Sequence, residues 1–358
     1  MRHFRNYKEQ KIEFQPGINL LVGANGQGKT NVLEGVYYLI TGKSYRVKLE
    51  NELIYWGEKN FYLQASFHAS DRLIRLESYY ETGKKVMKIN QLASKRLSDY
   101  VGTVNAVFFS PDDLHIIKNS PQERRRFLDL LISQIKPGHI LLLNSYLKII
   151  RQKNNLLKKE KNVSLLRSLL QAWNEELAET GAKIIVNRWH FTQSLNQYCK
   201  SIFKSIFSPK DDMELLYLGL GKKSLEESLK IFPELLENKI DQEIEKRNVL
   251  IGPHRDDLLI ELNGRSAKLF GSQGQQRSLV LCLKLAEMEI IRREKNEYPI
   301  LLLDDVLSEL DEFRREFLLN YIHTAGKQTV ITMTGADKKM IHFEKNVFQV
   351  SNGKIWRE

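Results

Sequence analysis

The chain has 358 residues, of which 42% are hydrophobic and 28% are charged, so it can bury a sizeable core and is not a mostly disordered protein. Its 55 lysines and arginines against 44 acidic residues give a net charge of +11, which favours an acidic partner such as nucleic acid or anionic lipid. Its 2 cysteines are too few for a disulfide framework or a zinc site, and fit a reducing compartment. No run of 18 apolar residues occurs and the N-terminus lacks the apolar core of a signal peptide, so we expect a cytoplasmic protein without a membrane span.

Short apolar or alternating runs predict strands throughout the first part of the chain. These strands are expected over residues 12–14, 18–22, 61–67, 72–80 and 86–89. Glycine turns separate several of them. Residues 1–111 therefore indicate an α/β fold rich in strands.

A glycine-rich loop follows the second of these strands and precedes a helical pattern. The letters G-A-N-G-Q-G-K-T at residues 23–30 match G-x-x-x-x-G-K-T in the strand–loop–helix setting that this motif requires. Backbone N–H groups of such a loop converge on phosphate oxygens, Lys29 adds a positive charge for binding and catalysis, and the Thr30 hydroxyl can bind Mg²⁺. The alternative is a chance glycine-rich turn. The residues predicted to bind the nucleotide are Gly23, Ala24, Asn25, Gly26, Gln27, Gly28, Lys29, Thr30 and Asn31.

Residues 112–250 are predicted to be mainly helical, and they hold most of the excess charge. Between residues 118 and 168, twelve basic residues stand against three acidic ones, a net charge of +9. Such an arm can follow DNA phosphates, although a solvated helix face explains the charge alone equally well. Three consecutive arginines on one helix cannot all face one way, so we expect at least one internal ion pair. The residues predicted to contact DNA are Arg124, Arg125, Lys148, Arg151, Lys153, Lys158 and Lys159. Helix breaks are expected at Pro121, Pro137 and Pro209.

The α/β pattern returns over residues 251–358. Strands are predicted at residues 257–262, 300–303 and 328–333, with a long amphipathic helix at residues 273–295. The chain therefore divides into one α/β domain made of two halves, residues 1–111 and 251–358, with a basic helical insertion over residues 112–250.

Two carboxylates follow the apolar strand at residues 300–303. Asp304 is expected to bind Mg²⁺ together with Thr30, and Asp305 to orient or deprotonate the attacking water. An apolar run followed by two aspartates is by itself more often a solvated strand end. The phosphate loop elsewhere in the chain favours the catalytic interpretation.

A third element, S-Q-G-Q-Q-R at residues 272–277, stands at the start of the long helix, where backbone N–H groups can bind a phosphate. The order of the three elements resembles the ABC-type ATPase family, whose signature is L-S-G-G-Q; here Gln273 replaces the first of its two glycines. The resemblance implies ATP and Mg²⁺ as cofactors. It also implies that Ser272, Gly274 and Gln275 of one subunit cover the nucleotide held by another, in an ATP-dependent homodimer.

Within that superfamily the chain resembles the RecF family of bacterial recombination mediators. The matching strings are F-R-N-Y at 4–7, F-S-P-D-D-L at 109–114, R-R-R-F-L-D at 124–129, G-P-H-R-D-D at 252–257 and L-L-D-D-V-L-S-E-L-D at 302–311, besides the loop and the signature. The resemblance implies an ABC-type ATPase head of the Rad50-like kind, with Arg5 and Asn6 near the nucleotide. It implies a weak, DNA-stimulated ATPase that binds duplex or gapped DNA at the nucleoid. Its implied partners are RecR, RecO and, downstream, RecA.

The chain departs from the superfamily pattern at the hydrolytic site. Thr332 and Thr334 stand where many ABC ATPases have a switch histidine, and Asp305 replaces the usual glutamate, which fits slow hydrolysis. The alternative function is a chromosome or DNA-end processing head of the SMC or Rad50 type. Those chains hold hundreds of coiled-coil residues between the two motif halves, whereas the interval here is about 240 residues. A transporter ATPase or a P-loop kinase leaves the basic arm or the signature unexplained.

Overall fold

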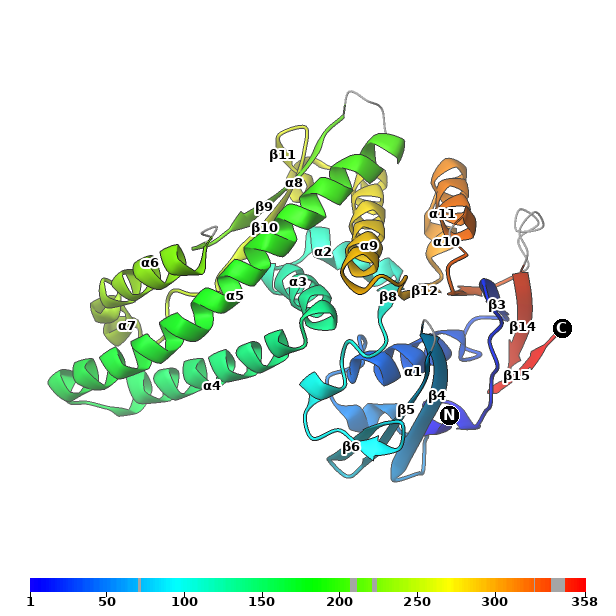
Figure 1. The fold of residues 1–358 in the computed structure, drawn as a ribbon, viewed down its shortest axis with the longest axis horizontal. Coiled ribbons are helices and arrows are strands. Elements are labelled where there is room, and N and C mark those ends of the chain that lie inside the picture. The colour runs from blue at the N-terminus through cyan, green and yellow to red at the C-terminus, as the bar shows by residue number, and fades with distance from the viewer. Residues whose placement is uncertain (70–71, 207–210, 221–223, 325, 336–344) are drawn as a thin grey trace. The chain divides into compact units, whose positions relative to one another are not determined.

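In the computed structural model of the protein, the described residues are 1–69, 72–206, 211–220, 224–324, 326–335 and 345–358. They form two compact units (Figure 1). The first combines Met1–Leu114 with Arg277–Glu358, and the second is His115–Gln276. None of the helices in the described ranges is both long and apolar enough to cross a membrane. Pro209, a predicted helix break, lies outside the described residues.

The first unit is built on a mostly parallel sheet of six strands in the order β15-β14-β3-β13-β12-β8. The strands are β3 (Ile18–Val22), β8 (Ala106–Phe109), β12 (Ile300–Asp304), β13 (Thr329–Met333), β14 (Lys345–Ser351) and β15 (Lys354–Arg357). β3, β8 and β13 are buried along their whole length, as continuous apolar strands of a covered parallel sheet should be. Their registers bring the carboxyl ends of four strands to one edge, where Val22 pairs with Met333, Asp304 with Thr332 and Leu303 with Phe109.

A second, antiparallel sheet completes this unit, in the order β2-β1-β4-β5-β6-β7. Its strands are β1 (Arg2–Phe4), β2 (Tyr7–Glu9), β4 (Asn60–Ala69), β5 (Arg72–Glu81), β6 (Lys84–Ile89) and β7 (Leu92–Ala93). Helix α1 (Lys29–Thr41) packs against strands of both sheets. The aromatic side chains of Phe4, Tyr38, Phe61 and Tyr80 meet in edge-to-face or stacked pairs in the core between them.

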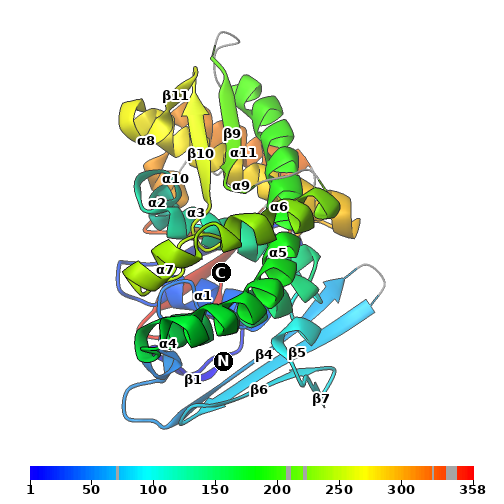
Figure 2. The same cartoon turned by 90° about the vertical axis from the view of Figure 1, so that its left-hand side faces the viewer.

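The second unit is mainly helical. Its elements are α2 (His115–Lys118), α3 (Pro121–Ile135), α4 (Gly138–Lys159), α5 (Val163–Ile206), α6 (Leu225–Glu237), α7 (Ile240–Lys246) and α8 (Ala267–Phe270), with β9 (Met213–Leu218), β10 (Asp257–Leu262) and β11 (Arg265–Ser266). Helices α4 and α5 form a long hairpin whose apolar residues line one core, and the three strands form a small sheet beside α5 (Figure 2). Pro121 lies at the first turn of α3 and Pro137 caps α4, so both predicted breaks separate helices.

The structure differs from the sequence predictions in one domain boundary and in one strand. The expected boundary at residue 250 is wrong, because β10 pairs along its length with β9 and belongs to the second unit. The chain returns to the first unit only at Arg277, inside helix α9 (Gln273–Lys295). Residues 12–14 form no strand; Ile12 and Phe14 instead pack, partly buried, against the core. The bounds of α9 agree with the predicted helix.

Candidate functional site

The glycine-rich loop joins β3 to α1 at the carboxyl edge of the parallel sheet. Gly26 and Gly28 have φ values of 78° and 108°, a region that disfavours other residues. A Cβ atom on Gly28 would lie 2.4 Å from the side-chain nitrogen of Asn6, and one on Gly23 would lie 2.2 Å from the carbonyl oxygen of Val350. Glycine is therefore required at both ends of the loop. The exposed residues 24–26 leave its rim open to solvent.

Lys29, the first residue of α1, folds back over this loop. Its Nζ donates hydrogen bonds to the carbonyl oxygens of Gly23 at 2.7 Å and Ala24 at 2.9 Å, and the residue is buried. Burial lowers the pKa of the amine, and the carboxylates of Asp305 and Asp304 oppose that effect. The amine thus lies against the loop and is influenced by both acidic residues, where the outer phosphates of a bound nucleotide would need a positive charge.

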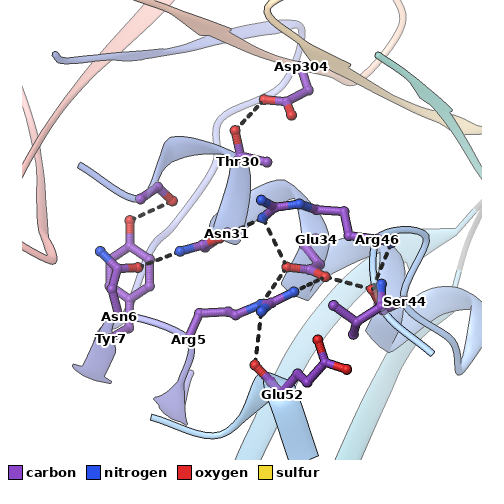
Figure 3. A network of polar contacts seen from close by, with 12 residues as sticks. Arg5, Asn6, Tyr7, Thr30, Asn31, Glu34, Ser44, Arg46, Glu52 and Asp304 are labelled. Atoms are coloured by element: carbon purple, nitrogen blue, oxygen red, sulfur yellow. Dashed lines mark hydrogen bonds and ion pairs between the residues drawn. The ribbon is translucent and has the colours of Figure 1, made fainter. Parts of the chain in front are cut away.

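Thr30 and Asp304, the two residues predicted to bind Mg²⁺, contact each other. The Thr30 hydroxyl donates to Asp304 Oδ1 at 2.8 Å, and the Thr332 hydroxyl donates to the same oxygen at 2.9 Å (Figure 3 draws the Thr30 bond). Burial raises the pKa of Asp304, while the two hydroxyls lower it. No cluster of three His, Cys, Asp or Glu side chains suited to a metal occurs among the described residues. One carboxylate and one hydroxyl fit Mg²⁺, which keeps waters and takes its other ligands from substrate phosphates.

Asp305 follows at the start of the short helix α10 (Val306–Glu309) and is exposed. Its φ of 54° places it in the left-handed region, and its N–H donates to the Thr332 hydroxyl at 2.9 Å. Thr332 therefore bridges the two aspartates, since it donates to one and accepts from the other. An aspartate tolerates this left-handed backbone conformation better than most residues. The exposed carboxylate of Asp305 is open to a water molecule.

Asn6 supports the loop, and Arg5 pairs with a buried glutamate. Asn6 donates to the Gln27 carbonyl at 3.1 Å and accepts a bond from Asn31 at 2.9 Å (Figure 3 draws the Asn31 bond). Arg5 forms a two-pronged pair with the buried carboxylate of Glu34, with both distances 2.8 Å. Its third nitrogen donates to a backbone carbonyl. The contact of Arg5 with the nucleotide stays a prediction; in the structure its guanidinium holds α1 through Glu34.

The structure adds a residue to the site that the sequence analysis missed. Arg46, in the segment after α1, donates to the side chain of Asn31 at 3.0 Å and lies 3.5 Å from Glu34. It is one of the charges that lower the pKa of Asp304, against the larger effect of burial. Next to it, the ring of Tyr45 packs against Phe108 with centroids 3.8 Å apart and ring planes tilted by 32°. The only sequence signal was an arginine soon after the helix-ending Gly42, which no spacing rule distinguishes.

The signature residues begin helix α9, in the second unit. Ser272 Oγ accepts the N–H of Gln275 at 3.3 Å, and the Gln275 side chain accepts the N–H of Ser272 at 2.9 Å. This reciprocal pair is a capping box, and it orients the first turn of a 23-residue helix. Ser272 and Gly274 are exposed, so the helix N-terminus is open to an anion from outside.

The basic arm divides into two groups. Arg124 pairs with both oxygens of Asp257 at 2.6 and 2.9 Å, and Lys153 is fully buried with Glu243 at 2.6 Å. The prediction that these two contact DNA is wrong, because their charges are neutralised inside the unit, while the expected internal ion pair among the three arginines is confirmed. Arg125 is half-buried and donates to the Asp256 carbonyl. The exposed residues of the predicted set are Lys148, Arg151, Lys158 and Lys159, all on α4.

Comparisons with known proteins extend over the whole chain. The family model for the RecF/RecN/SMC N terminal domain matches residues 1–355. The DNA replication and repair protein RecF of Desulfitobacterium hafniense is 52% identical over 358 residues, covering 100% of this chain and 98% of its own. That of Natranaerobius thermophilus is 41% identical over 371 residues, covering 99% and 96%.

Solved structures agree with this assignment. One, described as the recombination mediator protein RecF-ATP in the RecFOR pathway, has a TM-score of 0.90 at 34% identity, covering 99% of this chain and 97% of that one. An Smc head bound to the C-winged helix domain of ScpA has a TM-score of 0.57 at 18% identity, covering 100% and 95%, which shows a shared fold only. The fold is thus that of an ABC-type ATPase head, and the chain belongs to the RecF family.

Proposed function

We propose that the protein is an ATP-dependent DNA-binding protein of recombinational repair and replication restart. In this proposal it binds ATP with Mg²⁺, dimerises, holds duplex or gapped DNA, and helps RecO and RecR to load RecA. The observation that carries the proposal is the convergence of Lys29, Thr30, Asp304 and Asp305 at one sheet edge. Relatives described as RecF-ATP and as members of the RecFOR pathway support it. We further infer a cytoplasmic protein that associates with the nucleoid.

Each residue has a separate task in this mechanism. Backbone N–H groups of residues 23–28 and the Lys29 amine bind the phosphates, and Asn6 keeps the loop in shape. Thr30 and Asp304 would hold Mg²⁺, which supplies charge neutralisation between the phosphates when bound. Asp305 orients the attacking water and accepts its proton, with its backbone held by Thr332. A shorter acid than glutamate must reach farther to that water, which favours slow turnover.

Dimerisation is the step that links ATP to DNA. The capped N-terminus of α9 offers exposed Ser272 and Gly274, with Gln275, to a γ-phosphate bound by a second copy of the chain. The exposed basic residues Lys148 and Arg151 of α4, with the two lysines at the end of that helix, would then contact DNA phosphates. Hydrolysis at Asp305 separates the copies and releases the DNA. DNA stimulation of hydrolysis belongs to the same proposal.

Light scattering with and without ATP-Mg²⁺ and a short duplex tests this proposal. Wild type should dimerise with ATP and bind the duplex as the dimer. Lys29→Ala should lose ATP binding, dimerisation and ATP-dependent DNA retention together, while Lys43→Ala, an exposed lysine just after α1, should lose none of them. Ser272→Arg should bind ATP but stay monomeric, whereas Ser168→Arg, at an exposed position of α5, should behave as wild type. Nucleotide-dependent DNA retention in Lys29→Ala would contradict the switch.

A further inference from the structure

A charged cluster is buried in the middle of helix α9. Residues 278–288 of this helix are all buried, and two of them, Lys284 and Glu287, are ionisable residues with charged side chains at 7% and 4% exposure. Burying a charge is costly unless a partner compensates it. The cluster therefore calls for a reason beyond packing.

The partner of Lys284 comes from a distant part of the chain. Lys284 Nζ lies 3.0 Å from Asp113 Oδ1 and 3.4 Å from Glu287 Oε2. The other oxygen of Asp113 accepts the N–H of Ser110 at 2.8 Å, which closes the 3₁₀ turn Pro111–Leu114. Although burial opposes it, Asp113 and Glu287 raise the pKa of Lys284, so the lysine stays charged. One buried cation thus fixes a turn that already has its own cap.

That turn lies next to the hydrolytic carboxylates. It follows β8, whose last residue Phe109 pairs with Leu303 of β12, so Ser110 comes level with Asp304, the last residue of β12. The chain passes into the second unit directly after the turn, at residues 114–115, and returns at residues 276–277 in α9. Lys284 therefore joins, inside the first unit, the two segments through which the units are connected. Another ion pair of the first unit, between Arg277 of α9 and Glu309 of α10, is partly exposed.

We propose that Lys284 is a positioning residue for ATP hydrolysis. By holding Asp113, it keeps the turn Pro111–Leu114 beside Asp304 and transmits displacement of the signature helix α9 to the hydrolytic edge of the sheet. The proposal rests on the proposed ATPase function. It assigns no contact with nucleotide to Lys284, so the residue should affect turnover and leave ATP affinity alone.

The test compares Lys284→Met with Lys284→Arg and with Arg292→Met, an exposed arginine farther along the same helix. Lys284→Met should bind ATP within about twofold of wild type and lose about tenfold to hundredfold in kcat, since a displacement near 1 Å costs that much. Lys284→Arg should restore most of kcat, and Arg292→Met should change neither quantity. If Lys284→Met does not fold, Asp113→Asn, which leaves Lys284 paired with Glu287, should show the same split between kcat and ATP affinity.

Amide hydrogen exchange supplies a readout that does not need turnover. In Lys284→Met and Asp113→Asn, amides of residues 110–114 should exchange faster, while ATP still protects residues 23–30 as in wild type. A lower melting temperature with unchanged kcat and unchanged exchange would overturn the proposal, because the pair would then only stabilise the fold. If the wild type hydrolysed no ATP, the proposed function would fail, and the exchange comparison would still decide whether Lys284 fixes the turn.

Discussion

The charged residues around the phosphate loop of the first unit and those of the basic arm of the second are used in different ways. In the first unit, Lys29 and Asp305 lie at an open sheet edge and keep capacity for a ligand. In the second, Arg188 pairs with both oxygens of Asp129 at 2.8 Å, and Lys153 is buried with a glutamate. A count of basic residues therefore overstates the charge available to DNA, because some of these residues are paired with carboxylates inside the unit. A motif whose residues are neighbours in the chain does not depend on such a count.

The largest effect is expected where a charge serves the interior. Lys153→Met should lower the free energy of unfolding by about 3–5 kcal/mol, because Glu243 would remain buried without its cation. Lys148→Met, an exposed change on the same helix, should stay within about 0.5 kcal/mol. Chemical denaturation monitored by circular dichroism measures both. A Lys153→Met protein that is as stable as wild type but binds DNA poorly would return Lys153 to the contact surface.

At the open edge of the first unit, a change should affect chemistry and leave stability alone. Asp305→Asn keeps the shape of the side chain and removes the base, so turnover should fall by about 10²–10³-fold. ATP affinity and the ATP-dependent dimer should persist, and DNA release should slow. Single-turnover hydrolysis together with equilibrium ATP binding checks this. Normal turnover in Asp305→Asn would move the catalytic role to another residue.

The contribution of the exposed part of the arm should be measurable in the salt dependence of DNA binding. Replacing its four basic residues with glutamine should lower the slope of log K for duplex binding against log salt by about 0.9 for each DNA phosphate that the protein no longer neutralises. The four are Lys148, Arg151, Lys158 and Lys159. A matched variant removes four exposed lysines from the first unit, namely Lys8, Lys43, Lys84 and Lys95. If both variants lowered the slope equally, the arm would have no special role in binding.

The smallest expected effect is a pH-dependent change in melting temperature that comes from the charged cluster in α9. Burial raises the pKa of Glu287 to about 7, with Lys284 opposing the shift and Asp113 adding to it. When the pKa of a carboxyl is higher in the folded protein than in the unfolded chain, the protein loses stability as pH rises from the unfolded pKa towards the folded pKa. The reason is that the unfolded chain ionises first. Glu287→Gln removes this loss, so it should raise the melting temperature by a few degrees at pH 8 and by less at pH 5. An equal change in melting temperature at pH 8 and at pH 5 would mean that a group other than Glu287 titrates between these pH values.

Much of the fold was predictable from local patterns. The strand before the phosphate loop, helix α9 and the apolar strand before Asp304 were expected from periodicity and turn residues, because each is decided by neighbours in the chain. Strand β9 was not expected, and the boundary at residue 250 was wrong, for one reason. β9 is recognised as a strand through its pairing with β10, some forty residues away, and no local signal carries that partner.

The sequence by itself determined which residues are candidates to bind a phosphate and Mg²⁺, since the loop motif and the acidic strand end point to them through residue type and spacing. Only the tertiary structure decided the partner of each charge. It turned Arg5 towards Glu34, brought Arg46 to Asn31, and buried Lys153 and Lys284 against carboxylates far away in the chain. The physical reason is that the low dielectric of the interior makes every buried charge require a partner, and packing, which is not local, chooses that partner.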